Sequence, residues 1–182
     1  MSTTVAISNS LNLAPMVDTP QWYAIHTRAR HEKKVAIELA AAGIEVFLPV
    51  LRRRHRWSDR FKIVELPLFP CYIFAHTCPS SDFRFMLFKN GSIVGLLGNR
   101  GYGTPIPEEQ LQSVRRVLDN GLSIASHPFV KIGQRVRVRG GALHGVEGVL
   151  AGNNGGRRLV LSINAIQRSI AITLEGYDLE PI

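Results

Sequence analysis

The sequence of 182 residues predicts an α+β domain followed by a small antiparallel β-barrel. Up to about residue 118, short β-prone runs and helical segments follow the order β-α-β-β-β-α-β-α, which is typical of helices packed on a mainly antiparallel sheet. The last fifty or so residues instead carry short strand-like runs between glycine-rich turns, the pattern of a small barrel. We therefore expect a flexible tail over residues 1–20, an α+β sandwich over 21–118, a linker over 119–128 and the barrel over 129–182.

The elements of the first domain follow from periodicity and from helix-end signals. Gly43 ends a first helix, Ser80 or Ser81 can cap a second, and Pro107 opens a third with acidic residues in its first turn. The helices are expected at residues 30–42, from the Ser80 or Ser81 cap through residue 89, and at 107–118, and the strands at 22–27, 45–50, 61–66, from 72 onward, and at 92–97. Residues 52–60 form the arm and tip of a basic hairpin, with Ser58 and Asp59 at its turn.

The barrel is predicted from four runs. Residues 135–139 alternate arginine and valine, as in a half-buried strand. Further β-prone runs cover residues 146–150, 158–163 and 169–174. A helix through the glycines at 140, 141, 145 and 148 would cost about 1 kcal/mol per glycine relative to alanine, so strands are favoured.

An apolar run with two prolines and three aromatic residues, 66–74, is the strongest functional signal. Pro70 has no N–H for a sheet ladder, so a strand here should lie at an edge or start just after it. Exposed aromatic residues dominate the binding energy of many interfaces, which favours a docking site. The alternative is an ordinary core strand.

The formal charge of +8 is unevenly distributed, because basic residues are in excess between Arg28 and Arg60. A local excess of this kind favours a polyanionic partner, with nucleic acid ahead of membrane, although a solvated hairpin that keeps the protein soluble is the alternative. The basic residues of this segment are Arg28, Arg30, Lys33, Lys34, Arg52, Arg53, Arg54, Arg56 and Arg60.

No pattern of an enzyme, a metal site or a cofactor site is present in the sequence. The six histidines show no ligand spacing, no serine lies in a GxSxG elbow, and residues 153–156 lack the lysine of a P-loop. Cys71 and Cys78 form no CxxC pair, and the first twenty residues do not resemble a secretory signal, so we expect a reducing cytoplasm.

The motifs and their order resemble those of the NusG family of transcription elongation factors. Trp22-Tyr23 in the first strand, the following helix and Phe69-Pro70-Cys71-Tyr72 resemble the family's NGN domain, where Phe-Pro-Gly-Tyr is typical. Residues 131–138, with Gly141, Gly145 and Gly148, resemble a KOW domain. The resemblance covers residues 21–182, and residues 52–60 and 67–70 are closest to specialised RfaH- and UpxY-like paralogues.

The resemblance implies three interfaces. RNA polymerase would be bound at the clamp helices of its largest subunit by Trp22, Phe69, Pro70, Tyr72 and Phe74. Upstream or non-template DNA would contact Arg28, Arg30 and His31, with Arg52, Arg53, Arg54 and Arg56 as candidates for the same role. Ile166 and Arg168 would carry the KOW contact to the ribosomal protein NusE or to the termination factor Rho.

Two departures and one alternative function accompany the resemblance. Cys71 replaces the usual glycine, and Asp82-Phe83-Arg84-Phe85 stands where RfaH-like proteins carry His-Thr-Thr-Thr for the polymerase gate loop. Ile166 has two interpretations, as an exposed binding residue or as a plug of the barrel end. The alternative function is a KOW-type RNA-binding or ribosome-associated protein without polymerase contact, using arginines such as Arg135 and Arg137 on rRNA phosphates.

Overall fold

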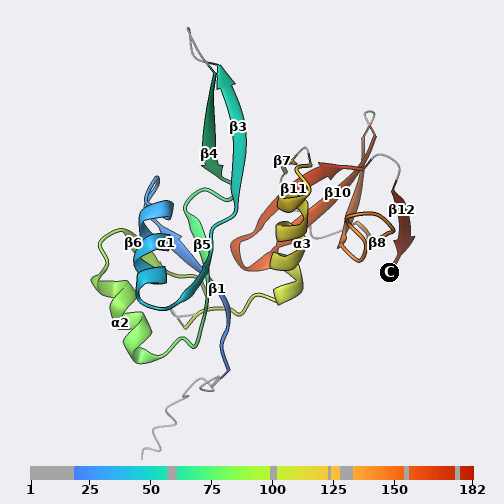
Figure 1. Ribbon diagram of the computed structural model, residues 1–182. Coiled ribbons are helices and arrows are strands. Elements are labelled where there is room, and N and C mark those ends of the chain that lie inside the picture. Colours follow the sequence, from blue (N-terminus) through green and yellow to red (C-terminus); the bar gives the residue numbers. More distant parts are fainter. Residues whose placement is uncertain are drawn as a thin grey trace, which may run out of the picture.

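The computed structural model describes two sheets joined by a helix, with a two-stranded hairpin projecting from the first sheet (Figure 1). The described residues are 19–56, 61–98, 102–122, 124–127, 133–153, 156–174 and 177–182. Residues 1–18 of the expected flexible tail, the hairpin turn at Ser58 and Asp59, and the Lys131-Ile132 start of the KOW pattern lie outside these residues. The α+β fold class is confirmed.

The first sheet has four antiparallel strands within the described residues, in the order β2-β5-β1-β6. One face is covered by α1 and α2, whose buried residues Val35, Leu39 and Phe83 pack with Ile25 and Ile73 of the sheet. The side chain of Ser80 caps α2 by accepting a hydrogen bond from the Phe83 N–H. The elements are β1 (Gln21–Thr27), α1 (Glu32–Ala41), β2 (Glu45–Phe47), β5 (Tyr72–Thr77), α2 (Ser81–Lys89) and β6 (Ile93–Leu96).

The other face of the same sheet belongs to a second apolar cluster that reaches into the C-terminal half. Trp22 and Phe74 on this face share the cluster with Leu111 and Val114 of α3 (Glu108–Asp119) and with buried residues of the second sheet. Strand residues alternate between faces, so neighbours such as Ile73 and Phe74 enter different clusters. The two halves of the chain are therefore joined by one hydrophobic core.

The second sheet is antiparallel, and its described strands follow the order β12-β8-β9-β10-β11-β7. They are β7 (Ile124–His127), β8 (Gln134–Arg139), β9 (Glu147–Asn153), β10 (Gly156–Ile163), β11 (Arg168–Thr173) and β12 (Asp178–Pro181). A 3-10 turn, η2 (Asn164–Ile166), connects β10 to β11. Two strands differ from the sequence-based expectation: β7 lies within the expected linker, and β12 was not predicted. Both strands are too short to give a recognisable alternation of apolar and polar residues. Their positions are set by pairing, β7 with β11 and β12 with β8.

The β3–β4 hairpin extends beyond the four-stranded sheet (Figure 1). Strand β3 (Val50–Arg56) pairs with β4 (Phe61–Pro67) from Val50 opposite Pro67 to Arg56 opposite Phe61. At the base, Glu65 accepts hydrogen bonds from Lys33 of α1 at 2.9 Å and from Arg52 at 3.1 Å. These two cations hold the pKa of the Glu65 carboxyl below its usual value, the hydrogen bond from Lys33 contributing most. The hairpin base is thus tied to α1.

Candidate functional site

The turn before β5 places the aromatic residues of the site. Cys71 has φ 68°, in the left-handed region, so the backbone here has the conformation for which the family's glycine is suited. The Cys71 N–H donates to Glu32 Oε1 at 2.8 Å, and the Cys71 carbonyl accepts from the Thr27 N–H at 2.9 Å. Glu32, 4 % exposed at the start of α1, therefore holds a strained turn in place.

Four of the five predicted polymerase-binding residues belong to the apolar cluster on the face of the sheet opposite α1 and α2: Trp22, Phe69, Tyr72 and Phe74. Trp22, Phe69 and Phe74 are buried, and Phe69 meets Phe74 edge-on with ring centroids 6.1 Å apart. Tyr72 is half-buried and stacks on His26 at 5.2 Å, while Pro70 is exposed. Of the two positions that Pro70 allowed, the structure has the second: β5 starts just after Pro70, at Tyr72, and runs between β2 and β1 and not at an edge.

Arg115 of α3 covers this aromatic face, and no sequence pattern pointed to it. Its guanidinium lies 4.9 Å from the ring centroid of Trp22 and 4.7 Å from that of Phe47. It also lies 3.7 Å from a carboxylate oxygen of Glu45, whose other oxygen is 3.2 Å from Nδ1 of His76. These contacts join residues far apart in the sequence, so no local pattern could predict them.

The predicted KOW contact residues are divided between the core and the surface. Ile166 is buried in the cluster that contains Phe69 and Phe74, so in this structure it packs in the core and is not exposed to a partner. Arg168 is exposed. Next to them, the N–H of Asn164 donates to Oε1 of Gln110 on α3 at 3.2 Å. The turn between β10 and β11 is therefore engaged with the rest of the chain.

The predicted DNA-binding residues lie in two exposed places. Arg28 and Arg30 are exposed in the β1–α1 loop, with His31 half-buried at its end. Arg30 has φ 65°, and the Arg28 N–H donates to the Ser92 carbonyl at 2.9 Å. In the hairpin, Arg52, Arg53 and Arg56 are exposed, and the side chain of Arg54 lies outside the described part of the structure. The described arginines of both places are thus open to solvent.

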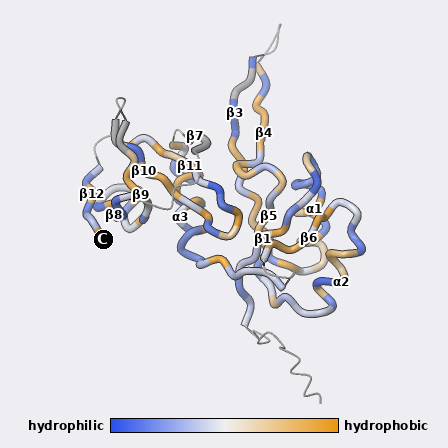
Figure 2. Tube along the Cα trace, turned by 180° about the vertical axis from the view of Figure 1, so that it is seen from behind, coloured by the Kyte–Doolittle hydropathy of each residue, from blue (hydrophilic) through white to orange (hydrophobic). Residues whose placement is uncertain are grey.

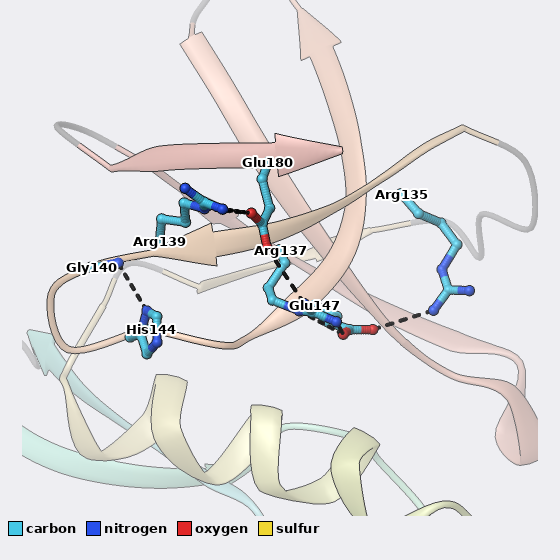
Figure 3. A network of polar contacts seen from close by, with 7 residues as sticks. All are labelled: Arg135, Arg137, Arg139, Gly140, His144, Glu147 and Glu180. Carbon is cyan, nitrogen blue, oxygen red and sulfur yellow. Dashed lines mark hydrogen bonds and ion pairs between the residues drawn. The ribbon is translucent and has the colours of Figure 1, made fainter. Parts of the chain in front are cut away.

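The arginines of the second sheet are in a different electrostatic setting (Figure 3). Glu147 accepts from Arg137 at 2.6 Å and from Arg135 at 3.3 Å, and Glu180 pairs with Arg137 and Arg139. The hydrogen bond with Glu147, followed by its charge, raises the pKa of Arg137 above its ordinary value. Two carboxylates thus offset much of the charge of three arginines, which weakens this surface as a phosphate site.

Two negative findings apply to the described residues. None of the described helices is both long and apolar enough to cross a membrane. In the same residues, no group of three or more histidines, cysteines or acids is arranged to hold a metal ion.

Comparison with known families identifies the first half of the chain. The family model described as "Transcription termination factor nusG" matches residues 20–115, more than half of the 182 residues. The chain belongs to the NusG family. It is therefore a transcription factor and not an enzyme.

One solved structure has a similar fold, and a second was matched with a low score. A structure titled "Domain interaction in Thermotoga maritima NusG" matches with a TM-score of 0.53 and 17% identity, covering 85% of this chain and 93% of that one. The structure titled "Crystal Structure of MjSpt4:Spt5 complex conformation B" matches with a TM-score of 0.32 and 13% identity, covering 88% of this chain and 97% of that one. No curated protein sequence matches.

Proposed function

We propose that this NusG-family chain is a cytoplasmic transcription elongation and antitermination factor, in the manner of the specialised RfaH- and UpxY-like paralogues. It binds RNA polymerase through one face of its four-stranded sheet, which we call the aromatic face: Trp22, Phe69, Pro70, Tyr72 and Phe74. The observation that carries the proposal is the clustering of Trp22, Phe69, Tyr72 and Phe74 on the one face of the sheet that α1 and α2 leave uncovered.

A helical partner suits this face. In the structure, α3 already lies against it, with Arg115 stacked on Trp22 and Phe47. The clamp helices of the polymerase's largest subunit would present a similar surface, and an aromatic cluster provides the buried anchors that such interfaces need. Since Trp22, Phe69 and Phe74 are buried, full engagement requires α3 to move away, whereas Tyr72 and Pro70 can make the first contact.

Nucleic acid is the second proposed partner. Arg28, Arg30 and His31 occupy the loop that is hydrogen-bonded to the residue preceding β6 and that leads into α1. Arginines of such a loop would contact phosphates of upstream duplex or non-template DNA at the transcription bubble, and so would the hairpin arginines. Phosphate contacts of this kind hold a factor in register on its template without reading a sequence.

The third partner is a protein bound at the η2 turn. Arg168 is accessible there, whereas Ile166 is packed in the common core. Binding of NusE or Rho through Ile166 would need the same opening that exposes the aromatic face, because both sets of residues belong to one cluster. The two protein partners would then be bound by one open form of the chain.

The competing function is an RNA-binding KOW protein. The ion pairs of Arg135, Arg137 and Arg139 with Glu147 and Glu180 argue against it, and it leaves the aromatic face without a role. Retention of core polymerase by the immobilised protein tests the choice. We expect retention to persist at high salt, since apolar docking survives salt while phosphate binding weakens steeply. Absence of polymerase retention, with binding of rRNA fragments at low salt, would favour the RNA-binding function.

A further inference from the structure

The β3–β4 hairpin carries cations on both of its faces. In an antiparallel pair, opposite residues point to the same face and successive residues alternate. Arg52 and Arg56 therefore lie on one face, with Glu65 and Phe61 opposite them, while Arg53 and Lys62 lie on the other face. Figure 2 shows hydrophilic residues along β3 and more hydrophobic ones along β4. The hairpin is thus a two-sided basic ribbon and not a sheet with one charged face.

Within the described residues, the cations beyond the base of the ribbon have no carboxylate to offset them. Glu65 is the only acid in strands β3 and β4, and it is already shared by Lys33 and Arg52. Arg53 donates a hydrogen bond to the carbonyl oxygen of Ile124 at 3.4 Å, and no carboxylate of the described part of the chain pairs with it. Within the described residues, Arg56 and Lys62 have no ion pair. This excess contrasts with the second sheet, where two carboxylates offset the arginines.

We propose that the β3–β4 ribbon enters the major groove of duplex DNA. A strand of seven residues is about 23 Å long at 3.3 Å per residue, which spans about two thirds of a turn of duplex. The major groove, about 12 Å wide, admits a two-stranded ribbon, whereas the minor groove is only about 6 Å wide. Inside the groove, each face of the ribbon meets one wall of phosphates, so cations on both faces are used.

Other nucleic acids fit the ribbon less well. A single strand is usually bound in a basic groove with stacking aromatic residues, which would leave the charges of one face unused. The major groove of A-form RNA is deep and too narrow for side chains to read.

The inference rests on the proposed nucleic-acid contact but is tested without polymerase. The full-length protein is titrated by fluorescence anisotropy, over a series of salt concentrations, with a 20-bp DNA duplex, an RNA duplex of the same sequence and one DNA strand. We expect the DNA duplex to bind at least about tenfold more tightly than the RNA duplex, because only its major groove admits the ribbon.

Variants of each face provide the sharper test. Each phosphate contact contributes about 0.9 to the slope of log affinity against log salt, so Arg53→Ala with Lys62→Ala should lower that slope by about 2. Arg52→Ala with Arg56→Ala should lower it by about 1, since Arg52 is already paired with Glu65. Lys34→Ala with Lys89→Ala removes the same charge from the helices α1 and α2 and should leave the slope unchanged. The altered side chains are exposed, and circular dichroism with an unchanged Tm verifies the fold.

The proposal is overturned if only one face affects the slope, if the RNA duplex or the single strand binds as well as the DNA duplex, or if all slopes are unchanged. It also fails if guanine N7, which faces the major groove, stays open to dimethyl sulfate methylation in the complex. Polymerase retention that depends on Tyr72 is measured separately. Absence of duplex binding with retention intact rejects the ribbon alone, while absence of retention rejects the proposed function.

Discussion

The two faces of the four-stranded sheet are covered in different ways. Ile25 and Ile73 lie under α1 and α2, which are close to them in the sequence and belong to the same α+β unit. Trp22 and Phe74, their neighbours along the same strands, are covered by α3 and by residues of the C-terminal sheet. A cover built from distant segments can be exchanged for another protein without unfolding the sheet. The first face therefore maintains the fold, and under the proposed function the second is the one that binds partners.

The largest expected effect is on the face under α1 and α2. Ile73→Ala should lower the free energy of unfolding by about 2–5 kcal/mol, since Ile73 is completely buried and its truncation leaves a cavity. Denaturant unfolding followed by circular dichroism measures this decrease. The polymerase affinity of the fraction that remains folded should stay within about twofold of the parent, a change of less than about 0.5 kcal/mol. Much weaker binding by that folded fraction would mean that the two faces are not independent.

The converse change is made on the aromatic face. Tyr72→Ala should weaken polymerase binding by about 2 kcal/mol or more, the effect of truncating an aromatic anchor. Its effect on stability should be smaller, because Tyr72 is only half-buried and its truncation removes chiefly the stacking on His26. Titration of polymerase with labelled protein measures the affinity, and Phe85→Ala on the exposed side of α2 is the matched aromatic control. Unchanged affinity in a folded Tyr72→Ala protein would remove Tyr72 from the interface.

Local features of the fold were predictable from the sequence, and long-range ones were not. The second helix and its Ser80 cap depend on neighbouring residues, and the structure places α2 where the sequence indicated. The position of β5 between β2 and β1 depends on contacts across the sheet, so Pro70 alone could not decide between an edge strand and a strand that starts just after it. The burial of Ile166 depends on how the two halves pack, which no turn signal encodes.

The same limit applies to the candidate site. Clusters of arginine are visible in the sequence, but their carboxylate partners are not, since Glu180 is far in the sequence from Arg137 and Arg139. From the sequence alone, the arginines that form ion pairs with carboxylates cannot be told from those that do not. The cover of the aromatic face by Arg115 is a contact of the same long-range kind.

The next prediction concerns the turn before β5, which contains Cys71. Cys71 adopts a left-handed conformation that costs an ordinary residue about 1–2 kcal/mol, so Cys71→Gly should raise the free energy of unfolding by about 1 kcal/mol. The main-chain hydrogen bond to Glu32 is kept in this variant. Cys71→Ala retains the strain and is the control, for which no gain is expected. An equal gain in both variants would assign the effect to the thiol and not to the backbone.

The smallest expected effect concerns the cover of the aromatic face. Arg115→Ala removes cation–π contacts with Trp22 and Phe47, worth about 0.5–1 kcal/mol at an exposed site, together with the ion pair to Glu45. If α3 must leave this face before polymerase binds, the variant should bind polymerase about two- to fivefold more tightly, as measured by the same titration.

Arg116→Ala is the matched control for this variant. Arg116 follows in the same helix but donates to the His144 carbonyl at 2.8 Å, a contact between α3 and the C-terminal half, so its removal should not uncover Trp22. An equal gain in both variants would mean that general loosening, and not the Arg115 contact, controls access. Weaker binding of Arg115→Ala alone would show instead that Arg115 is part of the polymerase interface. The aromatic face would then be extended by α3 and not masked by it.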